Sequence, residues 1–140
     1  MEYRKFGSTC LLRIDRGEEI VEQVRRFAQA EGVRLASVQA LGAVNDFTVG
    51  LYHTGDKRYL SENYTGDHEI VSLTGTIDTM DGRFYCHLHM SARRYDGRVV
   101  GGHLSRAVVS ATCEMVVTVL PGSVDRSFDE EIGLNLWKFS

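Results

Sequence analysis

The feature that most constrains the fold is a series of short β-type segments that follows one helix-type segment. Apolar and β-branched residues fill the β-type segments, and turn residues separate them. The predicted strands span residues 6–14, 35–41, 44–52, 69–78, 84–93, 99–104, 111–120 and 133–139. Consecutive strands without intervening helices favour antiparallel pairing. We therefore expect an α+β fold, a mainly antiparallel β-sheet with one principal α-helix over one face.

The single helix is predicted near the start of the chain. Apolar residues recur at helical spacing between residues 20 and 28, and charged residues occupy the opposite face. Asp15 with Glu18 has the spacing of an N-terminal capping box, and Gly32 supplies a C-terminal stop.

Length and composition indicate one globular domain over residues 1–140. The formal charge of −3 and the pI near 5.9 argue against a protein that neutralises many phosphates, because that function selects a basic surface. No apolar run is long enough to cross a bilayer, and the first residues lack the apolar core of a secretory signal. We therefore expect a cytoplasmic protein with no membrane partner.

Three cysteines, Cys10, Cys86 and Cys113, are widely spaced along the chain. An odd number without a Cys-x-x-Cys pair fits neither a disulfide framework nor a cysteine zinc knuckle. We predict that all three are buried free thiols.

The most distinctive chemical feature is a pair of histidines with a third one across a predicted hairpin. His87 and His89 are two residues apart in a strand, so their side chains share one face of the sheet. A three-residue loop over residues 95–97, closed by Gly97 in the left-handed region, pairs His89 with His103. Directly opposed residues point to the same face, so this register brings three imidazoles together.

The register of this hairpin decides whether the third imidazole joins the pair. A tighter, two-residue loop pairs His103 with Met90 and turns the imidazole away. A bulge at Gly101 and Gly102 restores the phase even with the tighter loop, and two missing side chains leave room beside the imidazoles for an ion and a water.

Three neutral imidazoles suit zinc or another divalent first-row metal. A site with three protein ligands leaves one position open, which also allows a metal-dependent enzyme or a small-ligand-binding protein. Glu114 lies in the following strand, where an acidic residue is costly to bury unpaired. It is a candidate either for orienting a ligand histidine or for pairing with an arginine. His53 and His68 stand beside turn residues and are predicted to be surface histidines.

Several segments, taken in order, resemble the plants-and-prokaryotes-conserved (PPC) domain family. They are residues 40–44 with 51–52, 69–75, 81–82, 87–89, 101–104 and 114–117, and near the end Arg126 and 133–134. The combination of His-x-His with Gly-Gly-His is similar to the prokaryotic branch of the family. The resemblance implies a sheet with one main helix, assembly into a homotrimer, and in some members a metal held by the histidines corresponding to His87, His89 and His103.

The resemblance also implies a DNA-binding or regulatory function. The basic residues available for it are Arg93, Arg94 and Arg98, at the tip of the predicted hairpin. Such a tip can contact phosphates, although the chain as a whole is acidic. We therefore expect weak, salt-sensitive DNA binding without strong base specificity.

Overall fold

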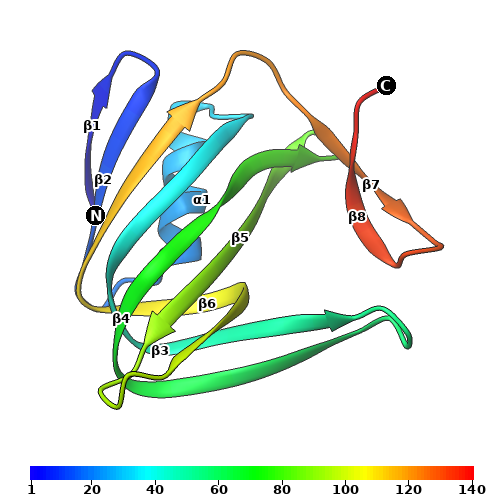
Figure 1. Cartoon of the computed structure of the whole chain (residues 1–140). Helices are drawn as coiled ribbons and strands as arrows, with labels where there is room; N and C mark the ends of the chain where they lie inside the picture. Colours follow the sequence, from blue (N-terminus) through cyan, green and yellow to red (C-terminus); the bar gives the residue numbers. More distant parts are fainter.

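The computed structural model of the protein describes all 140 residues as eight strands and one helix (Figure 1). The elements are β1 (Glu2–Phe6), β2 (Thr9–Asp15), α1 (Ile20–Glu31), β3 (Ala36–His53), β4 (Arg58–Met80), β5 (Arg83–Arg93), β6 (Val99–Val119), β7 (Asp125–Asp129) and β8 (Leu134–Lys138). Every strand pair is antiparallel except β4 with β7. The predicted α+β class, a mainly antiparallel sheet with one helix, is confirmed.

Four long strands close into a ring at the centre of the sheet. β3 and β5 each pair with both β4 and β6. The β1–β2 hairpin extends the sheet beyond β6. The β7–β8 hairpin stands at the other side of the molecule, where Figure 1 shows it in orange and red. It joins the sheet through only two parallel pairs, Thr79 with Asp125 and Met80 with Arg126.

The helix packs against β5 and β6 and supplies four of the 24 buried hydrophobic residues of the core. Its fully buried side chains include Ile20, Val24 and Phe27, which recur at the predicted helical spacing. Burying each of these side chains contributes about 1.5–3 kcal/mol to folding. No helix in the structure combines the length and apolar character that crossing a membrane requires.

The two ends of the helix differ in how well their residues were predicted. Gly32 ends the helix with a left-handed φ of 64°, as expected. At the start, Glu18 accepts the backbone N–H of Asp15, which is one half of the predicted capping box. The N-cap itself is Glu19, whose carboxylate accepts two backbone N–H groups of the first turn, so the predicted start of the helix was too early.

The long strands correct the prediction of several short ones. Apart from Leu35, the predicted strands 35–41 and 44–52 fall within the single strand β3, and apart from Leu120, those at 99–104 and 111–120 fall within β6. Irregularities in register fall near Gly42, which has a φ of 150° and lies where a Cβ would meet the Thr112 carbonyl oxygen at 2.2 Å. The glycine marks a bulge, and a bulge bends a strand without ending it.

The three cysteines are free, as predicted. Cys10 and Cys113 are buried, whereas Cys86 is only partly buried. Burial raises the pKa of Cys86 to about 11 and that of Cys113 to about 12. Both thiols therefore stay protonated and unreactive at neutral pH.

Candidate metal centre

The hairpin between β5 and β6 has the three-residue loop that the sequence predicts. The backbone N–H of Arg94 donates to the carbonyl of Arg98 at 2.8 Å, and Gly97 has a φ of 85°. In this register His89 lies directly opposite His103. The predicted pairing is confirmed without any bulge in this part of the hairpin.

The two glycines before His103 have a different role from the one expected of them. A Cβ on Gly101 would lie 2.5 Å from the Met90 carbonyl oxygen, and a Cβ on Gly102 would lie 2.3 Å from that of Gly50. These glycines allow β6 to pass close to β5 and β3. They do not open space for an ion.

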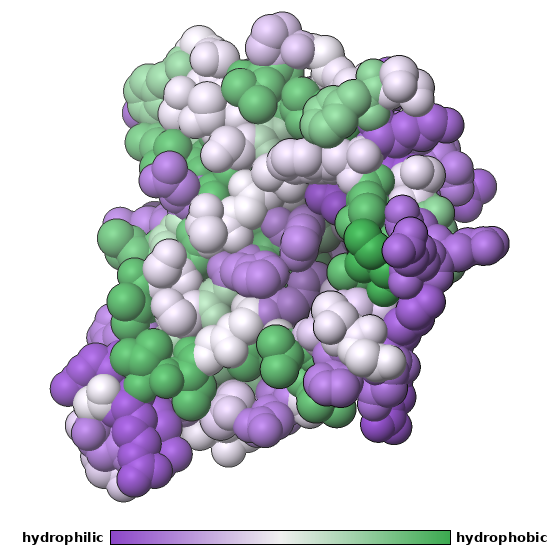
Figure 2. Space-filling model, turned by 45° about the vertical axis from the view of Figure 1, so that its right-hand side comes forward, coloured by the Kyte–Doolittle hydropathy of each residue, from purple (hydrophilic) through white to green (hydrophobic).

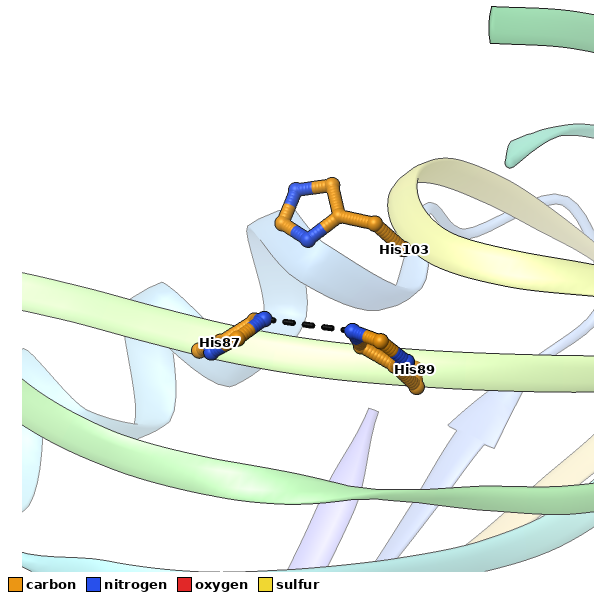
Figure 3. Close-up of side chains that lie close together, drawn as sticks. All are labelled: His87, His89 and His103. Atoms are coloured by element: carbon orange, nitrogen blue, oxygen red, sulfur yellow. Dashed lines mark hydrogen bonds between the residues drawn. The ribbon is translucent and has the colours of Figure 1, made fainter. Parts of the chain in front are cut away.

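The three imidazoles converge on one point (Figure 3). One ring nitrogen from each lies within 4.8 Å of a ring nitrogen from each of the others. The Nε2 atoms of His87 and His89 are 3.2 Å apart. Ligands placed tetrahedrally at 2.0–2.1 Å from zinc are about 3.3 Å from one another. Two of the three nitrogens therefore already have the spacing of metal ligands.

The third nitrogen is Nδ1 of His103, which is buried and has no hydrogen-bond partner. In Figure 3 this nitrogen, which is bonded to the ring carbon that joins the imidazole to the rest of the side chain, faces His87 and His89. A buried polar atom without a partner costs about 1–3 kcal/mol. A cation between the rings removes that cost, so the residues present fit a metal ion.

The surroundings of His87 and His103 favour the neutral form of their rings. Burial, followed by the neighbouring imidazoles of His103 and His89 and by the Arg126 guanidinium, lowers the pKa of His87. Burial and then His89 lower the pKa of His103. Neutral imidazole is the form that binds a metal, so both lone pairs are available at neutral pH and somewhat below it.

A pocket of about 270 Å³ lies beside the imidazoles, between the ring of long strands and the C-terminal hairpin. Its lining residues are Tyr59, Tyr85, His87, His103, Arg126, Leu134, Asn135, Leu136 and Trp137. Figure 2 shows a hollow in this side of the molecule, with hydrophilic atoms at its centre and hydrophobic atoms along one edge. A metal held by the three histidines therefore has an open side.

A buried ion pair anchors the wall of this pocket, and sequence reasoning missed it. The Nε and Nη2 atoms of Arg126 donate to the two carboxylate oxygens of Asp78 at 2.9 and 2.7 Å. The indole N–H of Trp137 donates to the same carboxylate at 2.7 Å. Asp78 is fully buried and Arg126 is 7% exposed. In the sequence, Asp78 stood at the end of a predicted strand, and Arg126 was noted only as part of the family resemblance.

Glu114 does not lie at the candidate metal centre, contrary to one of the two roles considered for it. It is exposed and stands opposite Leu41 of β3 and Arg13 of β2. His103 stands opposite Gly50. Gly50 is nine residues beyond Leu41 along β3, which is about 30 Å of extended chain. Glu114 therefore cannot orient a ligand histidine.

The other two histidines had the same prediction and different outcomes. His53 is exposed and contacts Asp56 at 2.7 Å, as expected of a surface histidine. His68 is only 5% exposed, so its prediction was wrong. Its Nδ1 donates to the Gly66 carbonyl at 2.7 Å, and its ring packs edge-on against Phe47.

The three arginines considered for DNA contact lie together at the β5–β6 hairpin tip. Arg93 and Arg98 are exposed and Arg94 is partly exposed. Asp96 lies between them, with carboxylate oxygens 3.8 Å from Arg94 and 3.7 Å from Arg98. The tip therefore carries a smaller positive charge than its arginines alone suggest.

The fold and the histidine cluster define a class of small β-rich domain with a candidate metal centre. The sequence model of the Plants and Prokaryotes Conserved (PCC) domain matches residues 1–121. The chain therefore belongs to this family, as its resemblance implied.

Two solved structures extend the likeness to the C-terminal hairpin. A candidate DNA-binding protein from Bacteroides thetaiotaomicron superposes with a TM-score of 0.96 at 29% identity, covering 99% of this chain and 96% of that one. A metal-containing protein from Archaeoglobus fulgidus superposes with a TM-score of 0.89 at 37% identity, covering 98% and 96%.

One curated relative is much longer than this chain. The bifunctional protein GlmU of a Synechococcus strain is 30% identical over 108 residues, which are 76% of this chain. The match spans only 16% of that protein, so it shows a shared domain and carries no activity across.

Proposed function

We propose that this protein binds one divalent first-row metal ion, zinc foremost, between His87, His89 and His103. The observation that carries the proposal is the buried, partnerless Nδ1 of His103, which faces the other two rings. The metal-containing relative from Archaeoglobus fulgidus supports it. When bound, the ion supplies two positive charges and an open coordination position, while the histidines hold it and the hairpin register keeps their rings together.

Elemental analysis tests the proposal directly. Protein purified without a histidine tag, loaded with zinc and freed of excess metal, is expected to hold one zinc ion per chain. Parallel loading with cobalt and nickel ranks the metals. A metal content no higher than that of a similarly treated protein without clustered histidines contradicts the proposal.

We also propose that residues 1–140 act as one domain that assembles into a homotrimer in the cytoplasm. Exposed apolar side chains of Leu11, Leu41 and Val116 surround a groove over β2, β3 and β6. Apolar groups gathered on a surface are typical of a protein interface. The three free cysteines are in keeping with a reducing compartment.

Sedimentation equilibrium is expected to give a mass of about 47 kDa, three times the 15.7 kDa of one chain. A charge on the groove disfavours assembly, so Leu41→Glu is expected to shift the mass towards one chain. Leu51→Glu is the matched control, because Leu51 is exposed near the turn between β3 and β4 and does not line the groove. A single-chain mass for the wild-type protein at micromolar concentration rules out the trimer.

A second candidate function is weak DNA binding by the β5–β6 hairpin tip. The candidate DNA-binding relative from Bacteroides thetaiotaomicron favours it, as do the clustered Arg93, Arg94 and Arg98. The net charge of −3 and the contacts of Asp96 oppose tight binding.

A titration of random duplex DNA across salt concentrations tests this second function. The logarithm of the binding constant falls linearly with the logarithm of the salt concentration, with a slope of about −0.9 for each phosphate contact. Three arginines therefore give a slope no steeper than about −3. Changing Arg93, Arg94 and Arg98 to alanine is expected to abolish the salt-dependent binding. Changing Arg16, Arg34 and Arg83, which are also exposed, is the matched control. Sequence-selective binding at physiological salt that survives the first triple change contradicts the assignment.

A further inference from the structure

The pocket beside the histidines has walls suited to a flat, apolar group. Tyr59, Tyr85 and Trp137 present aromatic rings to it, and the ring centroid of Tyr59 lies 5.2 Å from that of His103. Two leucines complete the apolar lining. A volume of about 270 Å³ holds a molecule of about nine non-hydrogen atoms, if each takes the roughly 30 Å³ of one water molecule.

The charges around the pocket favour a negatively charged occupant. No aspartate or glutamate lines it, and an imidazole that binds a metal does so in its neutral form. The positive charge of Arg126 is balanced by Asp78. A divalent ion held by the three imidazoles thus keeps both of its positive charges, which are costly to leave uncompensated in a partly buried site.

The hydrogen-bond donors of the pocket distinguish a carboxylate from a phosphate. The three guanidinium nitrogens of Arg126 already donate, two to Asp78 and one to the backbone carbonyl of Asn135. The side-chain amide of Asn135 faces the hydroxyl of Tyr85. A phosphate needs several charged donors around its oxygens, and the pocket has no free cluster of them. A carboxylate needs little beyond the metal.

We propose that this pocket binds a small aromatic carboxylate. One carboxylate oxygen occupies the open position of the metal, and the ring lies against Tyr59, Tyr85 and Trp137. This inference rests on the proposed metal site and names the class of molecule that the site accepts.

Trp137 makes the proposal measurable, because it is the only tryptophan of the chain and lines the pocket. Zinc-loaded protein, with its metal content counted in the same sample, is titrated with benzoate while Trp137 fluorescence is followed. Benzoate is expected to give a saturable change and to bind at least about tenfold more tightly than acetate, since acetate buries no ring. Benzyl alcohol, inorganic phosphate and metal-stripped protein with benzoate are expected to give no saturable change.

Cobalt-loaded protein supplies a second readout, because a carboxylate that enters the metal coordination changes its visible absorption. Tyr59→Ala is expected to weaken benzoate binding at least about fivefold while one metal ion per chain remains bound. Phe6→Ala, which removes an exposed aromatic side chain from β1, is the control that leaves both properties unchanged.

The outcomes separate this inference from the proposed function. The inference is overturned if metal-loaded protein does not bind benzoate, binds acetate equally tightly, or binds phosphate more tightly. None of these outcomes contradicts the metal site itself. Benzoate binding that is unchanged after the metal is stripped also overturns it. Protein that cannot be loaded with metal overturns the proposed function and the inference together.

Discussion

Replacing both His87 and His89 with alanine is expected to weaken zinc binding at least about a thousandfold, a loss of about 4 kcal/mol. The two imidazoles supply two of the three nitrogens at the cluster, and their Nε2 atoms have the 3.2 Å spacing of ligands to one ion. The single remaining imidazole, that of His103, cannot compete with the water molecules that hydrate the ion. Competition with a chromophoric chelator measures the affinity.

Thermal unfolding gives an independent measure of the same loss. Zinc at a hundred times its dissociation constant stabilises the wild-type fold by about 2.7 kcal/mol and raises its Tm, whereas the double variant gains nothing. His53→Ala is the matched control, because His53 is an exposed histidine outside the cluster. Equal zinc affinity in the double variant and the control disproves the three-histidine site.

Breaking the buried pair of Arg126 and Asp78 is expected to have the largest effect on stability. Arg126→Met leaves a fully buried carboxylate whose remaining donors are the indole of Trp137 and the hydroxyl of Thr76. Removing one partner of a buried ion pair costs about 3–5 kcal/mol. Urea unfolding at a fixed protein concentration measures this change, since assembly couples stability to concentration.

An exposed ion pair elsewhere in the chain provides the comparison. Arg106 contacts Asp46 at 2.9 Å at the surface, so Arg106→Met is expected to cost at most about 1 kcal/mol. The double change Arg126→Met with Asp78→Leu is expected to recover part of the loss, because no unpaired charge stays buried. Equal costs for Arg126→Met and Arg106→Met contradict the anchoring role of the buried pair.

The histidine register shows how far the sequence alone reaches. A hairpin register depends on its own short loop, so the sequence left only two registers open, and the structure has the three-residue loop with a left-handed Gly97 that places His89 opposite His103. The helix was predictable for the same reason, since its apolar spacing and the glycine at its end are local features.

Strand continuity was less accessible to the sequence. The sequence around Gly42 of β3 is compatible both with a strand that bends at the glycine and with a strand that ends there. The pairing of β3 with β4 and β6 on its two sides decides between these outcomes, because it satisfies the backbone of both halves.

The sequence by itself determined the sheet-and-helix class and the free cysteines. It left two loops open for the histidine hairpin, and the structure has the one that pairs His89 with His103. Only the tertiary structure placed Glu114 far from the histidines and joined Asp78 to Arg126, 48 residues further along the chain. It also brought Trp137 to the edge of the histidine pocket. These relations depend on how distant strands pair and pack. The residues next to a position in the sequence do not identify a contact partner that is distant along the chain.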